Sequence, residues 1–172
     1  AVAALHRGDL KVFLGMGGNF VRAAPDTKLT AEGMGRCELT VHVSTKLNRS
    51  HLTHGKEALI LPCLGRTERD VQEAGPQSIS TEDAMSSVML SLGSRKPASP
   101  HLLSEPEIIA RIARATMPES ATPWEWYVGD YDRIRDTMAK ALPGFEGFNE
   151  LVRQQYGFRI PQPARVRDFR TP

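Results

Sequence analysis

The sequence has no long apolar run, and no single sign of charge dominates it. None of its apolar stretches approaches the roughly 20 residues that a membrane-spanning helix needs. No charged and then apolar leader precedes a small-residue cleavage site. We therefore expect a cytoplasmic chain without membrane insertion. With 22 basic and 20 acidic residues, the formal charge of +2 is too even for a nucleic-acid surface, so no nucleic-acid partner is predicted.

Cysteine is also scarce, since the chain has only Cys37 and Cys63. Two cysteines so far apart provide neither a disulfide framework nor a C-x-x-C metal pair. We predict that both are buried thiols. Internal repeats and low-complexity tracts are missing as well, which excludes solenoids and disordered arrays.

What the chain does contain suits one globular unit, because 172 residues with 40% apolar side chains can bury a sizeable core. The segment 1–8 is typical of the last turns of a helix closed by a glycine. The segment 160–172 carries three prolines among basic residues and is typical of a linker. We therefore expect a piece of a larger protein.

Three short apolar runs predict strands, at 11–16, 39–43 and 58–61. Asp26 is placed to begin a helix between the first two, extending to residue 36. Strand, helix and strand at this spacing imply a parallel sheet. The sequence thus predicts an α/β fold, a Rossmann-like three-layer domain with a small, mostly parallel sheet.

The second half of the chain predicts mainly helices. Residues 70–100 contain several glycines and prolines, and we expect a long, partly irregular excursion with a strand near 85–90. Ser104 begins a capping box ahead of a helix lined by Ile108 and Ile112. Asp130 is placed to cap a further helix that Pro143 stops, and a short helix is expected near 148–152. The elements after residue 120 form a C-terminal helical and extended tail.

The glycine-rich turn after the first strand has the clearest chemical use. It contains Gly15, Gly17, Gly18 and Asn19. Glycines let backbone N–H groups approach an anionic oxygen, and the Asn19 amide can add contacts. The turn is neither a complete G-x-G-x-x-G fingerprint nor a Walker loop. A simple sharp turn is an equally good interpretation.

Polar residues also follow the second strand, namely Ser44, Thr45, Lys46 and Asn48. Open parallel sheets bind ligands beyond the carboxyl ends of their strands. Two polar strand ends next to each other favour a binding site there. A solvated loop rich in turn formers is the alternative.

Two other groups suggest chemistry. His42, His51 and His54 invite a metal hypothesis, but no cysteine or carboxylate completes a familiar ligand spacing, so we predict no metal site. A small metal hydrolase would need His51 and His54 to converge with a carboxylate. The aromatic segment 124–127 can stack on a ligand, but packing against the core is the more economical interpretation.

Several of these segments together resemble one domain of the molybdopterin oxidoreductases, the family of formate dehydrogenase, nitrate reductase and dimethyl sulfoxide reductase. The resemblance is carried by residues 11–19, 24–27 and 58–62. Residues 44–52, 61–68, 104–106, 132–136 and 143–145 are similar to the formate-dehydrogenase-like alpha-subunit branch. This chain departs from the family pattern at Phe20, where relatives have proline, and at Val43 or Ser44, where many have aspartate.

The resemblance implies a fragment of a molybdopterin-dependent oxidoreductase. Residues 1–120 would bind part of a molybdopterin guanine dinucleotide, and 121–172 would be a helical extension and linker toward a missing C-terminal domain. It implies that Gly15, Gly17, Gly18 and Asn19 contact the phosphate or guanosine portion. Ser44, Thr45, Lys46 and Asn48 would form a second wall.

By the same resemblance, the metal ligand, molybdenum or tungsten, and any iron–sulfur cluster belong to other parts of the parent protein. The partners implied are its remaining domains, and the fragment alone is not expected to be catalytic. The alternative is a stand-alone α/β binding or assembly domain with no redox role, in which the glycine turn is structural.

Overall fold

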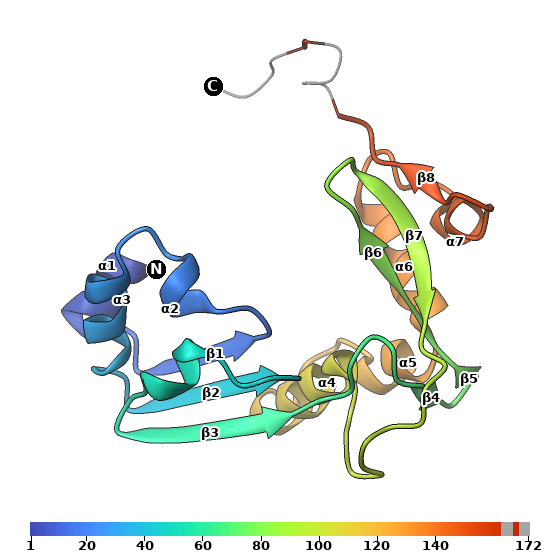
Figure 1. Cartoon of the computed structure of the whole chain (residues 1–172). Helices are drawn as coiled ribbons and strands as arrows, with labels where there is room; N and C mark the ends of the chain where they lie inside the picture. The colour runs from blue at the N-terminus through green and yellow to red at the C-terminus, as the bar shows by residue number, and fades with distance from the viewer. Residues whose placement is uncertain (163–166, 169–172) are drawn as a thin grey trace. The chain divides into compact units, whose positions relative to one another are not determined.

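The computed structural model describes residues 1–162 and 167–168, which form two compact units (Figure 1). Unit 1 comprises Ala1–Gly65 and Ser99–Glu105, and unit 2 comprises Arg66–Ala98 and the described part of Pro106–Pro172. Most of the predicted linker, 160–172, lies outside the described residues. The assignment of 1–120 and 121–172 to domains of a longer protein stays a prediction.

Unit 1 contains the predicted parallel sheet, so the α/β fold class is confirmed. Its strands are β1 (Val12–Met16), β2 (Leu39–Ser44) and β3 (Glu57–Pro62), in the order β1-β2-β3. In the register, Met16 lies opposite Val43, and Val43 lies opposite Leu61. The central strand is the most buried because it has a neighbour on each side. The three strands therefore end at one edge of the sheet.

Four short helices accompany this sheet: α1 (Val2–Arg7), α2 (Phe20–Ala23), α3 (Thr27–Met34) and the 3-10 helix η1 (Arg49–Leu52). The chain leaves α1 through Gly8, whose φ of 77° is the left-handed conformation expected of a terminating glycine. Asp26 caps α3 by accepting a hydrogen bond from the Leu29 N–H at 2.9 Å. Both local predictions are confirmed.

The core of unit 1 lies between α1, α2 and α3, with Leu5, Val21, Met34 and Cys37 fully buried in it. Phe13 of β1 packs against this cluster. Cys37 and Cys63 are both buried thiols, as the sequence predicts. Burial also raises the pKa of the Cys37 thiol, which disfavours the reactive thiolate.

Unit 2 contains an antiparallel sheet that the sequence analysis did not anticipate. Strands β6 (Ser78–Glu82), β7 (Ser87–Leu92) and β8 (Phe158–Arg159) pair in that order, and β4 (Val71–Gln72) pairs with β5 (Gly75–Pro76). The strand expected near 85–90 is confirmed as β7, whereas the part of the excursion before it is less irregular than expected, because it supplies β6 of the hairpin. Its first strand, Ser-Ile-Ser-Thr-Glu, is too polar to give a clear strand signal, and its pairing comes from β7.

The helices of unit 2 follow the prediction more closely. They are α4 (Glu105–Thr116), which begins at the last residue of unit 1, α5 (Trp124–Gly129), α6 (Tyr131–Ala141) and α7 (Phe148–Val152). Asp130 caps α6 by accepting from the Asp132 N–H at 3.0 Å. The aromatic segment lies in α5, and Trp124 packs against the buried cluster of Ala110 and Tyr131, as the sequence favoured.

Among the described residues, no helix has both the length and the apolar character needed to cross a membrane.

Candidate functional site

The carboxyl ends of β1 and β2 place the two predicted polar segments side by side. Met16 and Val43 are opposite residues of neighbouring parallel strands, and the Gly17 N–H continues the ladder by donating to the Val43 carbonyl at 2.8 Å. Because parallel strands end at the same edge, the loop after β1 and the loop after β2 emerge together. This edge of unit 1 is the candidate site.

The glycines at the end of β1 and in the loop after it are favoured for two different structural reasons. Gly17 and Gly18 have φ values of 62° and 66°, which favour glycine, and both are exposed. A Cβ on Gly18 would meet nothing within 4 Å, so space remains open over this residue. Gly15 instead faces the interior of unit 1, where a Cβ would lie 2.8 Å from the Phe13 ring and 3.2 Å from His42 Nδ1.

Hydrogen bonds join the two loops across 29 to 31 residues of sequence. The Asn48 side-chain amide donates to the Gly18 carbonyl at 2.7 Å. The Ser50 hydroxyl donates to Asn19 Oδ1 at 2.8 Å and accepts from the Val21 N–H at 3.0 Å. The structure therefore brings Gly18, Asn19 and Asn48 together, as the sequence led us to expect of two neighbouring strand ends.

The rest of the second loop forms an exposed polar turn. The Ser44 hydroxyl donates to the Lys46 carbonyl at 2.7 Å, which closes the turn on itself. Thr45 and Lys46 are exposed, and Arg49 adds a second cation. Thr45 and Lys46 thus have side chains available to a ligand, whereas the side chains of Ser44 and Asn48 already hold backbone atoms.

The site edge presents mainly hydrogen-bond donors. Within residues 1–162 and 167–168, no acceptor is bonded to the backbone N–H of Gly18 or Asn19. Since the Asn19 Oδ1 accepts from Ser50, the Nδ2 group of the same amide is left to donate outward. Donors of this kind, with Lys46 and Arg49 nearby in sequence, suit an anionic or carbonyl-bearing ligand.

One acceptor also lies at this edge. The Glu105 carboxylate has an oxygen 3.8 Å from the point that a Cβ on Gly17 would occupy. Glu105 reaches this position because the segment just before it pairs with the residues that follow β3. Leu103 forms a parallel bridge with Cys63, and its carbonyl accepts a hydrogen bond from the Leu64 N–H at 2.9 Å. The sequence analysis did not select Glu105, since it lies 88 residues along the chain from Gly17.

Sequence reasoning weighed His42 and His51 only as metal ligands and did not assign the buried residues behind the loops a supporting role. Ser50 is 1% exposed, and His51 supports the second loop by accepting the Asn48 N–H on Nδ1 at 2.9 Å. The His51 ring lies 4.9 Å from the His42 ring, centroid to centroid. Burial, and the neighbouring His51, lower the pKa of His42 below its ordinary value. Only the spacing of Asn48 and His51, which form a capping box, could have indicated this support.

The histidines do not assemble a metal site. In the part of the chain that the structure describes, no group of three His, Cys, Asp or Glu side chains is arranged to hold a metal ion. His54 contacts the Gly55 carbonyl through Nδ1 at 2.7 Å instead. The convergence that a metal hydrolase would require is not found among these residues.

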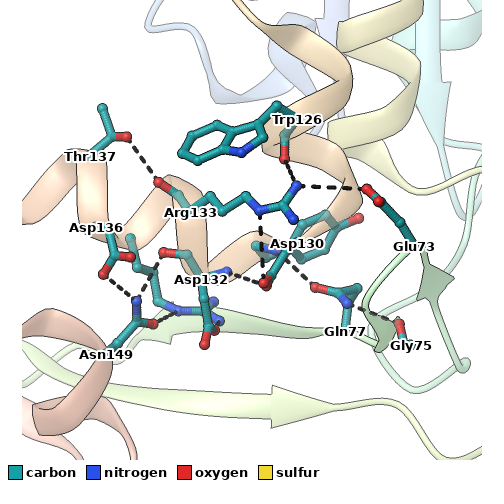
Figure 2. A network of polar contacts seen from close by, with 12 residues as sticks. Glu73, Gly75, Gln77, Trp126, Asp130, Asp132, Arg133, Asp136, Thr137 and Asn149 are labelled. Carbon is teal, nitrogen blue, oxygen red and sulfur yellow. Dashed lines mark hydrogen bonds and ion pairs between the residues drawn. The ribbon is translucent and has the colours of Figure 1, made fainter.

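Unit 2 has a polar network with a different character, which Figure 2 shows from close by. The Arg133 guanidinium lies over the Trp126 ring, 5.1 Å from its centroid, and donates to the Trp126 carbonyl at 2.8 Å. The Asn149 amide donates to the Asp132 carbonyl at 2.9 Å and to the Asp136 carboxylate at 2.6 Å. These groups satisfy one another, which is typical of a structural network rather than a ligand site.

Comparisons with known proteins give a consistent but partial picture. No model of a protein family matches the chain. An uncharacterized oxidoreductase of Mycobacterium bovis and another of Mycobacterium tuberculosis are each 51% identical over 173 residues, covering 99% of this chain. Protein YdeP of Escherichia coli is 42% identical over 172 residues, covering the whole chain.

These relatives are much longer than the chain. It spans 22% of the length of the mycobacterial proteins and 23% of the length of the Escherichia coli protein. The similarity therefore concerns about a fifth of each relative. The mycobacterial relatives are named as oxidoreductases, and this chain is similar to one part of them.

Proposed function

We propose that this chain is a cofactor-binding part of a larger molybdopterin-dependent oxidoreductase of the formate-dehydrogenase-like kind. In this proposal it holds the nucleotide portion of a molybdopterin guanine dinucleotide at the carboxyl edge of the unit 1 sheet. The names of the mycobacterial relatives support the reaction class, and their greater length supports a part of a longer protein. The resemblance in the sequence supplies the identity of the cofactor.

The observation that carries the proposal is the joining of the two strand-end loops. Asn48 and Ser50 bond to Gly18 and Asn19 across the gap between the loops, so the donors of both form one surface. A loop that served only as a turn would not need partners about 30 residues away. The arrangement is that of a preorganised site, in which little ordering is required when a ligand binds.

The residues present fit a nucleotide. A diphosphate is anionic and accepts hydrogen bonds, and the edge offers the N–H groups of Gly18 and Asn19 together with the Lys46 cation. Space for close approach exists over Gly18, where an added Cβ would have no neighbour within 4 Å. Thr45 adds an exposed hydroxyl on the second loop.

In the proposed reaction the bound cofactor supplies the redox chemistry at its metal. This chain's own residues bind and orient the nucleotide end. Gly17 and Gly18 give backbone access, Asn19 and Lys46 contact the ligand, and Asn48 keeps the loops in register. Ser44 shapes the turn that presents Thr45 and Lys46, and Gly15 leaves room for the His42 ring behind the first loop.

Cofactor extraction and metal analysis of the full-length protein that contains this chain test the proposal. Purified protein is expected to contain molybdenum or tungsten and to release a pterin on oxidative denaturation, in a constant ratio to protein. A Lys46→Ala variant is expected to retain less pterin, while Lys28→Ala, an exposed cation on α3, serves as the charge-matched control.

The contrary outcome is an active full-length protein that contains neither metal nor pterin. That result would leave the chain as an α/β binding or assembly domain without a redox role, in which Gly17 and Gly18 form a structural turn. Equal loss of pterin in the Lys46 and Lys28 variants would place the cofactor elsewhere in the protein.

A further inference from the structure

A polar pocket of about 260 Å³ lies in unit 2, beside the network of Figure 2. Its charged lining residues come from the start of α6 and the end of α7, and they are Asp130, Asp132, Arg135 and Arg153. Apolar residues of the β4–β5 hairpin and of β7 also line it, among them Pro76 and Leu90. The pocket thus combines charged and apolar groups, which is typical of a site for a small organic ligand.

Arg135 is buried beside this pocket and does not use all of its donors. A guanidinium group has five N–H groups. Those of Arg135 donate to Asn149 Oδ1 at 2.7 Å, to the Ser78 carbonyl at 2.9 Å and to the Asp132 carboxylate. Among the residues that the structure describes, none accepts the two remaining N–H groups. Because a buried donor without an acceptor costs free energy, these two groups favour an acceptor in the pocket.

The charges of the lining leave one positive charge uncompensated. Asp132 is shared by two cations, with Arg135 on one carboxylate oxygen and Arg153 on the other. Asp130 has its own compensation, because its carboxylate accepts the Asp132 N–H at 3.0 Å and lies 4.0 Å from the Arg133 guanidinium, which is not part of the lining. Two guanidinium groups therefore share a single anion, and one further negative charge would balance them.

We propose that this pocket binds a small monocarboxylic acid, whose carboxylate accepts hydrogen bonds from Arg135 and Arg153 while its hydrocarbon part lies against Pro76 and Leu90. The planar guanidinium group matches the two oxygens of a carboxylate. A ligand with two negative charges is disfavoured, since Asp130 belongs to the same lining. This inference goes beyond the proposed function and does not depend on it, because every residue of the pocket belongs to unit 2.

The test titrates the full-length protein with butyrate and with butyramide, and it follows binding by saturation-transfer NMR. Butyramide has the same shape as butyrate but no charge. The wild type is expected to bind butyrate about tenfold to hundredfold more tightly, which is the range for a charged hydrogen bond. Equal binding of the two compounds would overturn the inference.

Arg153→Met shows whether this preference belongs to the pocket. The Arg153 side chain is half-exposed, so the variant is expected to fold, and its preference for butyrate is expected to fall by about tenfold or more. Arg114→Met removes another exposed guanidinium of unit 2 and is the matched control, which should keep the wild-type preference. A preference for butyrate that persists in Arg153→Met would place the carboxylate elsewhere and would contradict the proposal.

Asp130→Asn provides a gain that damage to the fold cannot produce. Asparagine caps a helix as well as aspartate does, so the start of α6 is preserved. Without the negative charge of Asp130, the affinity for succinate, a dianion, is expected to rise about tenfold. Asp9→Asn makes the same change at an exposed residue of unit 1 and should leave the affinity for succinate unchanged. If Asp130→Asn binds succinate no better than Asp9→Asn does, the charge selection proposed for the pocket is wrong.

Discussion

Ser50 shows how a single buried hydroxyl supports the candidate site. Its Oγ accepts from Val21 and donates to Asn19, so one side chain satisfies a backbone donor and also orients an amide. Neither bond can be read from the sequence, because Ser50 is one of several hydroxyl residues in a polar loop. The support becomes visible only when the partners are known.

We predict that Ser50→Ala lowers the free energy of unfolding by about 1–3 kcal/mol, because it leaves the buried Val21 N–H without its acceptor. Urea denaturation of the chain measures this change. Thr45→Ala, in the exposed part of the same loop, is the control and is expected to stay within about 0.5 kcal/mol of the wild type. A Ser50 variant as stable as the Thr45 variant would contradict the role given to this hydroxyl.

His42 is a buried imidazole whose protonation is expected to disfavour the folded state of unit 1. Its folded-state pKa is lowered by burial, and further by His51, from an ordinary value of 6.5. Below that value the unfolded chain therefore binds a proton that the folded chain does not, and acid favours unfolding. We predict that the contribution of His42 to stability is level above about pH 6.5 and decreases as the pH falls below it.

Denaturation of the wild type and of His42→Phe at pH 5 and pH 8 checks this prediction. The phenylalanine keeps an aromatic ring beside Phe13 and cannot be protonated, so its stability is expected to fall less between the two values. His54→Gln, at an exposed position, should keep the wild-type pH dependence. Identical pH profiles for His42→Phe and the wild type would argue against burial of a neutral imidazole.

At the scale of elements, the helix starts are specified largely by residues that are close together in the sequence. Asp26 and Asp130 cap their helices through bonds to residues two or three positions along the chain, so the sequence predicts these starts. The parallel strands are also evident, since each is a short apolar run. Strand β7 was expected near 85–90, but its antiparallel partner β6 was missed because a half-exposed, polar strand has no strong period of its own.

The approach of β3 to the segment before β2 depends on Gly55. A Cβ at this residue would lie 2.4 Å from the Cys37 carbonyl oxygen, and the Lys56 N–H donates to that same oxygen at 2.9 Å. We predict that Gly55→Ala destabilises the chain by about 1–3 kcal/mol, since the backbone must move apart to make room. Thermal or urea unfolding measures the loss.

Gly35→Ala is the matched control for this change. A Cβ at Gly35 meets only ordinary contacts, the nearest at 3.5 Å, and its φ of −61° suits any residue. Reduced freedom of the unfolded chain should make it neutral or slightly stabilising, by up to about 1 kcal/mol. If both alanines are tolerated equally, the close approach at Gly55 has no energetic importance.

At the scale of the whole molecule, each compact unit has its own core and its own polar interior. In unit 2, Arg135 is 4% exposed and donates to Asn149 Oδ1 at 2.7 Å and to the Ser78 carbonyl at 2.9 Å, and it pairs with Asp132. Burial alone would raise the pKa of Asp132, but hydrogen bonds and charges from Arg135 and Arg153 outweigh it and lower the pKa. The network joins α6, α7 and β6.

We predict that Arg135→Met costs about 3–5 kcal/mol, because it removes one of the two partners of Asp132 and leaves the buried Asn149 Oδ1 and the half-buried Ser78 carbonyl without this donor. Hydrogen exchange should report lost protection mainly in unit 2, where all of these contacts lie. Arg153→Met removes the other, half-exposed partner of Asp132 and is expected to cost about 0–1 kcal/mol. Equal costs for the two arginines would refute the distinction between a buried and an exposed ion pair.

By itself, the sequence determined the features that depend on neighbours along the chain. These are the helix caps, the three apolar strands, the glycine turn and the polar loop after the second strand, since local hydrogen bonding and apolar spacing specify them. Parallel pairing then made it predictable that Asn19 and Asn48 would lie at one edge, because parallel strands end together.

Only the tertiary structure decided which side chains face that edge and what holds them. Glu105, Ser50 and His42 come from separate segments, and their roles arise from packing between elements rather than from any local pattern. A carboxylate next to a glycine turn, or a hydroxyl behind an amide, depends on distances that sequence spacing does not specify. The candidate site was therefore located by the sequence, whereas its donors, its acceptor and their support were set by the fold.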